Sequence, residues 1–138
     1  MKILGRHLLA ELSDCRSNIL DNSVELEKAM KDAARLSGAT VVDTVFHHYN
    51  PQGLSGIVII AESHLSIHTW PEYRYAAVDC FTCGSHVDPA RALKHLQEVL
   101  GSQSVQVRDL NRGLPSATDQ IIAHKAGVEV TAAVTAVE

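Results

Sequence analysis

The apolar positions of the chain repeat with two periods, one typical of helices and the other typical of strands. Two segments have the three- and four-residue spacing of a helix that buries one face; their apolar positions are Leu26, Ala29, Met30, Ala33 and Leu36, and then Leu93, Leu96, Val99 and Leu100. Asn22 and Glu25 form a capping box at the start of the first segment, and an Asp-Pro pair at 88–89 opens the second. Gly38 and Gly101 follow as typical C-terminal stops, so we expect two helices.

Other segments are rich in β-branched or alternating residues, which predicts strands at 2–12, 40–49, 56–61, 64–70, 73–82 and 104–110. Along 64–70, one face of the strand should carry Leu65, Ile67 and Thr69, and the other Ser66, His68 and Trp70. The run 56–61 is apolar throughout, so we expect it to be buried on both faces. We expect Val105 and Val107 to face inward.

The order of these elements is strand-helix-strand-strand, followed by strand-strand-helix-strand. Short turns between consecutive strands imply antiparallel pairing, and two helices suffice to cover only one face of a sheet. The sequence therefore predicts an α+β fold: a two-layer sandwich of an antiparallel sheet with both helices on one face. The other face must be covered or stay in contact with water.

Composition narrows the class of protein. With 138 residues the chain has the length of one domain. A net charge of −4 without long runs of one sign argues against a nucleic-acid surface and is compatible with a cationic small substrate. The apolar runs are too short for a membrane span, and the apolar start is too short for a signal peptide. Three cysteines, an odd number, favour a reducing compartment over a disulfide framework, so we expect the cytoplasm.

Reactive side chains crowd the otherwise apolar stretch from 53 to 84. They are Ser55, Glu62, Ser63, His64, His68, Glu72, Cys80 and Cys83. A plain core hairpin does not place so many titratable or nucleophilic groups together, because each buried one must find a partner. This stretch is therefore the candidate functional site.

The stretch resembles the self-cleaving region of the small prokaryotic S-adenosylmethionine decarboxylase proenzymes, which are pyruvoyl enzymes. The resemblance rests on Glu-Ser-His-Leu-Ser-Ile-His-Thr-Trp-Pro-Glu at 62–72 and Phe-Thr-Cys-Gly at 81–84, supported by Gly-Arg-His-Leu-Leu-Ala-Glu at 5–11 and Pro-Gln-Gly-Leu-Ser-Gly at 51–56. We expect one such domain over residues 1–113. The Ala-, Val- and Thr-rich residues 114–138 depart from the family and receive no role.

The resemblance implies self-cleavage between Glu62 and Ser63, giving a β chain of residues 1–62 and an α chain that begins at 63 with a pyruvoyl group made from Ser63. A serine hydroxyl is a weak nucleophile and needs a nearby base or a strained peptide. In the family, the residue that matches His68 assists processing by proton transfer, and Ser55 matches a supporting residue. Cys83 matches the acid that returns a proton to the substrate, a role that suits a thiol, which is mostly protonated at pH 7.

The family also suggests how the substrate, S-adenosylmethionine, is held. The pyruvoyl group forms a Schiff base with the substrate amine, and the decarboxylated product is the aminopropyl donor for polyamine (spermidine) synthesis. Glu72 matches the acceptor of the ribose hydroxyls, and Tyr49 matches an aromatic residue that stacks on adenine. Glu11 is expected near the amine or sulfonium. The resemblance further implies a homodimer of cleaved protomers, with no nucleic-acid or membrane partner.

Each of these residues also has an ordinary structural interpretation. Serine at a bend is usually a turn residue, and histidine or cysteine in a strand is often part of the core. Cys80 is interpreted as a packing residue, because positions three apart on a strand, such as Cys80 and Cys83, face opposite sides.

Other functions remain as alternatives. A metal-binding module or metal hydrolase could draw on His47, His48, His64, His68, Cys80 and Cys83, but no HExxH or paired CxxC motif is present. A thiol hydrolase using Cys83 and His68 lacks an accompanying oxyanion motif, and a non-enzymatic interaction domain is the third alternative. Among pyruvoyl enzymes, those acting on aspartate, histidine or arginine are the alternative class, although their cleavage sites do not read Glu-Ser-His.

Overall fold

The computed structural model describes residues 3–113, 122–123 and 129–130. Its elements are β1 (Gly5–Cys15), the short 3-10 helix η1 (Asn18–Asp21), α1 (Ser23–Leu36), β2 (Val41–His48), β3 (Leu54–Ile60), β4 (Ser63–Trp70), η2 (Pro71–Tyr73), β5 (Tyr75–Thr82), α2 (Pro89–Leu100) and β6 (Ser102–Arg112). Two further strands, β7 (Ile122–Ala123) and β8 (Glu129–Val130), pair with each other. The predicted C-terminal segment 114–138 otherwise lies outside the described residues.

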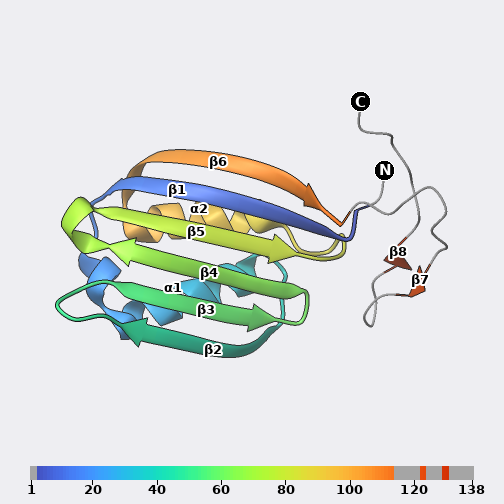
Figure 1. Cartoon of the computed structure of the whole chain (residues 1–138), viewed down its shortest axis with the longest axis horizontal. Coiled ribbons are helices and arrows are strands. Elements are labelled where there is room, and N and C mark those ends of the chain that lie inside the picture. The colour runs from blue at the N-terminus through green and yellow to red at the C-terminus, as the bar shows by residue number, and fades with distance from the viewer. Residues whose placement is uncertain (1–2, 114–121, 124–128, 131–138) are drawn as a thin grey trace.

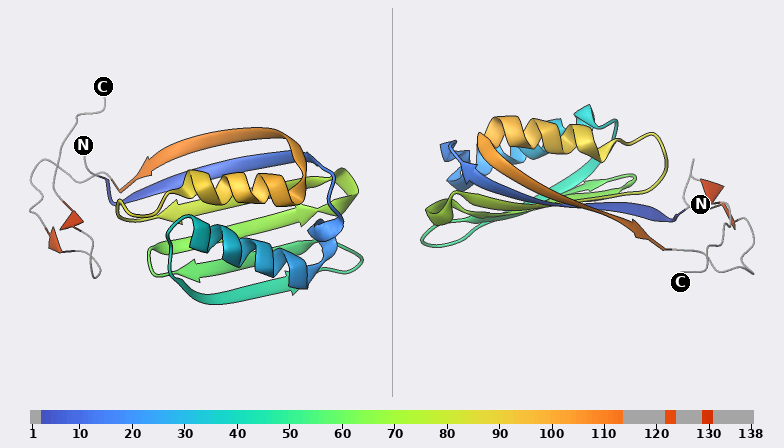
Figure 2. Two further views of the ribbon diagram at one scale, coloured as in Figure 1. Left: turned by 180° about the vertical axis from the view of Figure 1, so that it is seen from behind. Right: turned by 90° about the horizontal axis from the view of Figure 1, so that it is seen from above.

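Six strands form one sheet in the order β2-β3-β4-β5-β1-β6, and every neighbouring pair is antiparallel. Both helices cover the same face of this sheet, as Figures 1 and 2 show. The predicted α+β sandwich, with its element order, is therefore confirmed. None of the described helices has the length and apolar character needed to cross a membrane.

The helices begin and end where the sequence predicts. The Asn22 side chain accepts a hydrogen bond from the Glu25 N–H at 3.1 Å, and the Asp88 side chain accepts one from the Ala90 N–H at 3.0 Å. Gly101 takes the left-handed conformation (φ 62°) that closes α2. The local capping residues therefore set the limits of both helices.

The core lies between the sheet and the helices. The inward side chains of the sheet include Leu12 on β1, Val58 on β3, Ile67 on β4 and Val78 on β5, which meet residues such as Leu26, Met30 and Leu96 of the helices. Leu65, Ile67 and Thr69 are buried, as the alternation along 64–70 predicts. Burial of these apolar side chains is the main force that holds the two layers together.

The prediction that the strand 56–61 is buried on both faces is wrong, whereas Val105 and Val107 face inward as predicted, although Val107 is not fully buried. Strand β3 is buried on one face only, because Ile59 lies on the side without helices and is 40% exposed. Val107 shares the helix side with Val105, since they pair with Ala10 and Leu12, but Val107 remains 46% exposed. It belongs to the edge strand β6, where only part of the strand is packed against the core.

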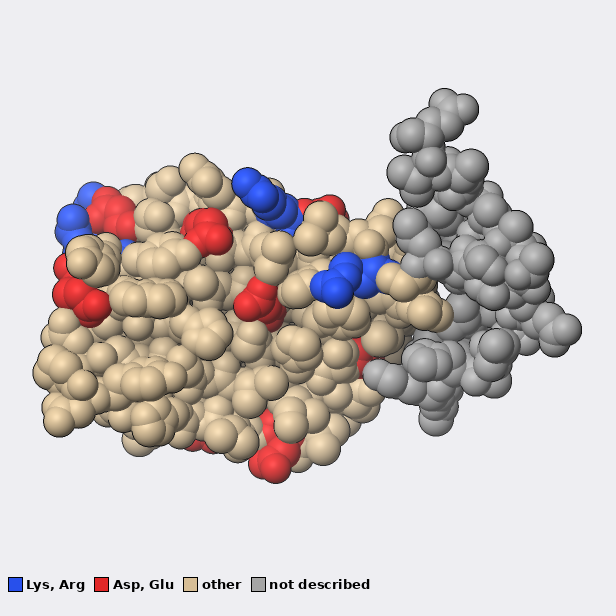
Figure 3. Space-filling model, in the orientation of Figure 1, with Lys and Arg blue, Asp and Glu red and all other residues tan. Residues whose placement is uncertain are grey.

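The face of the sheet without helices, here called the open face, is partly apolar. Val45, Ile59, Trp70 and Leu110 are each at least 39% exposed there. Figure 3, in the orientation of Figure 1, shows that charged side chains are sparse on this face. An apolar sheet face of this kind typically marks a surface that another molecule covers.

Candidate active site

The connection between β3 and β4 holds the predicted cleavage site. Ser63, the first residue of β4, has φ 143°, a backbone conformation that residues with a side chain rarely adopt. Such a conformation costs on the order of 1–3 kcal/mol, and it persists only where the surroundings enforce it. The carbonyl of Glu62, which belongs to the peptide bond with Ser63, accepts a hydrogen bond from the Cys83 N–H at 2.9 Å. The structure thus brings Glu62, Ser63 and Cys83 together.

The Glu62 side chain fixes the peptide on the N-terminal side of this bond. It is only 5% exposed, and its Oε1 accepts a hydrogen bond from the Thr40 N–H at 2.9 Å. The Thr40 carbonyl in turn accepts a bond from the Ala61 N–H at 2.9 Å. His86 Nε2 lies 3.7 Å from the same carboxylate. Glu62, whose carbonyl a nucleophile would attack, is therefore held through its side chain and the residue before it.

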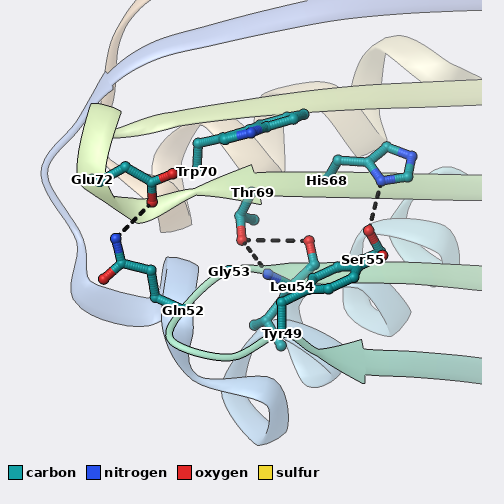
Figure 4. Close-up of a pocket in the computed structure, with 9 residues that line it drawn as sticks. All are labelled: Tyr49, Gln52, Gly53, Leu54, Ser55, His68, Thr69, Trp70 and Glu72. Atoms are coloured by element: carbon teal, nitrogen blue, oxygen red, sulfur yellow. Dashed lines mark hydrogen bonds between the residues drawn. The ribbon is translucent and has the colours of Figure 1, made fainter.

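A second pair of residues meets at the opposite end of β4. Ser55 Oγ and His68 Nδ1 lie 2.8 Å apart on neighbouring strands, where the two residues are register partners. Both lie on the open face and line a pocket of about 360 Å³ with Tyr49, Trp70 and Glu72 (Figure 4). Gln52 Nε2 donates a 3.0 Å hydrogen bond to the Glu72 carboxylate. Four of the predicted site residues, Tyr49, Ser55, His68 and Glu72, therefore share one pocket.

Asp21 holds the turn that carries this pocket. Its Oδ1 accepts a hydrogen bond from the Gly53 N–H at 2.8 Å and lies 2.8 Å from His48 Nε2. The hydrogen bond from the Gly53 N–H is the main cause that lowers the pKa of the Asp21 carboxyl, and the contact with His48 is the second cause. The Tyr49 N–H bonds to the Gly53 carbonyl at 2.8 Å and closes the turn. An ionised Asp21 therefore joins η1 to the loop between β2 and β3.

Glu11 lies on the same row of the open face as the Ser55–His68 pair. The register aligns Ser55 with His68, His68 with Ala77, and Ala77 with Glu11. The Tyr75 hydroxyl donates a hydrogen bond to the Glu11 carboxylate. The ring of Tyr75 is 5.3 Å from the ring of Trp70. Glu11 is thus linked through Tyr75 to the edge of the pocket.

The structure does not bring His68 to Ser63 within one chain. The two residues are five positions apart on β4, which corresponds to about 16 Å along a strand. His68 also has the parity of the open face, whereas Ser63 has that of Leu65 and Ile67, which are buried against the helices. Cys83 follows β5 at the Ser63 end, so a hydrolase that pairs Cys83 with His68 of the same chain is not formed.

The metal-binding alternative finds no support in the geometry of the described residues, and Cys80 is buried. Cys80 is 1% exposed in the core, where burial raises the pKa of its thiol to about 12, so it is a packing residue as predicted. Within the described part of the chain, no three His, Cys, Asp or Glu side chains are grouped so that they could hold a metal ion.

The sequence places His64 among the reactive side chains of the stretch 53–84 but does not predict its contact with Ser63. Its Nδ1 lies 3.4 Å from Ser63 Oγ, and its ring stacks on Phe81 with centroids 5.9 Å apart. Neighbouring residues in a regular strand point to opposite faces, so this contact was not expected. The contact depends on the irregular φ of Ser63, which no sequence pattern predicts.

Comparisons with known proteins identify the family of the chain. The family model for S-adenosylmethionine decarboxylase matches residues 6–113. An S-adenosylmethionine decarboxylase proenzyme of Thermosipho melanesiensis is 57% identical over 113 residues, which cover 82% of this chain and 87% of the relative. A proenzyme of the same name from Thermotoga maritima is 54% identical with the same coverage.

A solved structure gives the same answer at the level of the fold. The crystal structure of the adenosylmethionine decarboxylase from Aquifex aeolicus superposes with a TM-score of 0.78 and 29% identity, covering 86% of this chain and 98% of that one. The family match over residues 6–113 includes both helices and almost all of the six-stranded sheet. The chain therefore belongs to the S-adenosylmethionine decarboxylase family of enzymes.

Proposed function

We propose that the chain is a proenzyme that cuts itself between Glu62 and Ser63 and then decarboxylates S-adenosylmethionine with a pyruvoyl group made from Ser63. The observation that carries the proposal is the geometry of the bond itself: a serine with φ 143° follows a carbonyl that the Cys83 N–H holds at 2.9 Å. A backbone N–H aimed at a carbonyl oxygen stabilises the negative charge that develops there when a nucleophile adds.

The proposed cleavage uses groups of the chain. The Ser63 hydroxyl adds to the Glu62 carbonyl carbon, and the peptide C–N bond breaks to leave an ester and a free Ser63 amine. Removal of the Ser63 α-proton then expels the Glu62 carboxylate. The remaining dehydroalanine reacts with water, releases ammonia and leaves a pyruvoyl group at the start of the α chain. The products are residues 1–62 and residues 63–138.

We further propose that the working site needs a second copy of the chain. We assign proton transfer to His68 with Ser55, and both lie on the open face, with His68 about 16 Å along the strand from Ser63. The open face is partly apolar, which supports its packing on another sheet. In a two-fold dimer built on this face, the pocket of one protomer meets the Ser63 end of the other, as an isologous interface allows.

In this arrangement the pocket residues bind and orient the substrate. The Glu72 carboxylate is suited to accept hydrogen bonds from the ribose hydroxyls, and the ring of Tyr49, 49% exposed, offers a face to adenine. Glu11 offers a negative charge to the cationic end of the substrate. Cys83 is placed beside the cleavage bond, where its thiol returns a proton to the α-carbon. The pyruvoyl carbonyl supplies the electron sink that decarboxylation of an α-amino acid requires.

The cellular setting follows from the same residues. The three cysteines are all buried and free of disulfides, which supports a reducing compartment. We therefore place the enzyme in the cytoplasm.

Two measurements test the proposal. Intact-mass spectrometry of the purified protein should find two chains that divide at Glu62–Ser63, and Ser63→Ala should leave one uncut chain. Carboxyl-labelled S-adenosylmethionine should release labelled CO2 only with the cut protein, and cyanoborohydride should attach the product to the α chain. An uncut yet active protein would contradict the mechanism. Labelled CO2 from aspartate, histidine or arginine, with S-adenosylmethionine inert, would keep the mechanism and overturn the substrate.

A further inference from the structure

We propose that His64 is a catalytic residue of the self-cleavage, the base that takes the proton of the Ser63 hydroxyl as its oxygen attacks the Glu62 carbonyl. The inference rests on the proposed function, because it concerns the first step of that cleavage. Nδ1 of His64 lies 3.4 Å from Ser63 Oγ in the same chain. By contrast, His68 shares the open face with His64 but lies about 16 Å along β4 from Ser63 of the same chain.

The His64 ring is held in place by its neighbours. His64 pairs with Ile59 of β3 and Phe81 of β5, and it stacks on the Phe81 ring at an interplanar angle of 19°. The φ of 143° at Ser63 turns that residue out of regular strand geometry. A separation of 3.4 Å is long for a hydrogen bond, but contacts of catalytic bases commonly shorten only in the reacting state.

The surroundings keep His64 in its neutral, proton-accepting form. Burial is the main cause that lowers the pKa of His64, and the neighbouring His7 lowers it further. The charge of Asp79 opposes this shift in part. His7 lies between two charged groups: its Nδ1 is 2.9 Å from Arg112 Nη1, and its Nε2 is 3.3 Å from Asp79 Oδ1. Since the guanidinium can only donate, His7 Nδ1 is the acceptor, whereas its Nε2 is buried close to Asp79 without a hydrogen bond. Arg112 also lies over the Phe81 ring at 5.5 Å.

The step is balanced in protons and bonds. A new bond forms between Ser63 Oγ and the Glu62 carbonyl carbon while the hydroxyl proton passes to His64 Nδ1. The carbonyl oxygen becomes negatively charged where the Cys83 N–H already donates at 2.9 Å. When the C–N bond breaks, the proton moves from His64 to the Ser63 nitrogen, which leaves as an amine. His64 returns to its starting state.

This assignment divides the two histidines between the two stages of cleavage. Ester formation needs only groups of one protomer, namely Ser63, His64 and the Cys83 N–H. Removal of the Ser63 α-proton is the later stage, and it is the one that requires the partner's His68. The ester should therefore form before, or without, a complete dimer site.

The test measures ester formation directly in the full-length chain. In a His68→Ala background the ester accumulates, and hydroxylamine cuts it to two bands on a denaturing gel. Adding His64→Ala should slow the appearance of this hydroxylamine-sensitive form about 100-fold, the lower end for loss of a general base. Imidazole in the buffer should restore part of the rate. His95→Ala, a histidine of α2 outside the site, is the matched control and should leave the rate unchanged.

A pH profile provides a readout that a merely structural role does not move. With His64 present, the rate of ester formation should stay constant near pH 7 and fall in acid below the ordinary histidine pKa, because the base must be neutral. This acid limb should disappear in His64→Gln. An unchanged rate in folded His64→Ala, or a loss that neither imidazole nor pH affects, would overturn the inference. If neither the wild-type chain nor any variant that keeps Ser63 were cleaved, the proposed function would be overturned as well.

Discussion

Ser55 and His68 face each other across β3 and β4 with their side chains 2.8 Å apart, on the opposite side of the sheet from the parity of Ser63. His68 also lies about 16 Å along β4 from Ser63, too far for it to process Ser63 of its own chain. The pair is instead consistent with the proposed site shared between two protomers, in which each chain supplies Ser63 to one site and His68 to the other.

Mixed dimers should reveal this sharing. Ser63→Ala and His68→Ala are each expected to lack complete processing alone. Co-expressed in equal amounts, they should regain about a quarter of the wild-type decarboxylase activity, because half of the dimers are mixed and each holds one intact site. Gel separation of tagged chains should show that only the His68→Ala chain is cut. Cutting of the Ser63→Ala chain, or full cutting of His68→Ala alone, would contradict the arrangement.

Replacing Cys83 should separate processing from turnover. Cys83→Ala keeps the backbone N–H that contacts Glu62, so the chain should still be cut, at least in part. Without the thiol, the proton is expected to reach the pyruvoyl carbon instead, which converts the group to alanine after a few turnovers. Mass spectrometry of the α chain detects that change, together with the loss of steady-state CO2 release.

Cys80→Ala is the matched control for that experiment. Cys80 is buried in the core and its pKa of about 12 keeps the thiol neutral at all working pH values. Its replacement should leave cleavage and turnover intact and lower the free energy of unfolding by about 1 kcal/mol. An inactive Cys80→Ala together with an active Cys83→Ala would assign the proton donor to the wrong cysteine.

Changes in the pocket should weaken substrate binding more than cleavage. Glu72→Gln and Tyr49→Ala should each raise KM about tenfold, equivalent to about 1.4 kcal/mol, and leave the extent of self-cleavage unchanged. Steady-state assays on the cut protein measure this, with the exposed helix variant Glu98→Gln as control. An unchanged KM in both variants would remove these residues from the binding site.

The turn beneath the pocket should depend on the charge of Asp21. Because its pKa is lowered in the folded chain, the stability that Asp21 contributes is complete above the unfolded value of about 3.9 and is lost as the pH falls through the folded value. Asp21→Asn should therefore raise KM and the rate of proteolysis near Gly53 at pH 7, and make both insensitive to mild acid. Wild-type behaviour of Asp21→Asn at pH 7 would show that the turn holds without this carboxylate.

Most of the fold could be predicted from local sequence signals, whereas the relation between the two parts of the site could not. Local signals act over a few residues, so they can be recognised in the sequence; examples are the caps Asn22 and Asp88 and the alternation of Leu65 and Ile67. The exposure of Val107 depends on which strand lies at the edge, and sequence order does not specify strand order.

The site shows the same limit more sharply. The motif named Ser63, His68 and Cys83, but their separation follows from the strand register and from which face each one occupies. The contact of His64 with Ser63 arises from one backbone angle, φ 143°, that strand periodicity excludes. Composition and spacing carry no information on such an angle, so it can be seen only in the three-dimensional structure.

The strand order has a consequence for the cut protein. A break after residue 62 places β1, β2, β3 and α1 in one fragment and β4, β5, α2 and β6 in the other. In the sheet, β1 lies between β5 and β6, and β3 lies beside β4, so the two fragments are interdigitated and share three hydrogen-bonded ladders. The fragments cannot drift apart while the sheet is folded. Once unfolded, however, they are separate molecules, so recovery of the native state becomes a second-order encounter that slows on dilution.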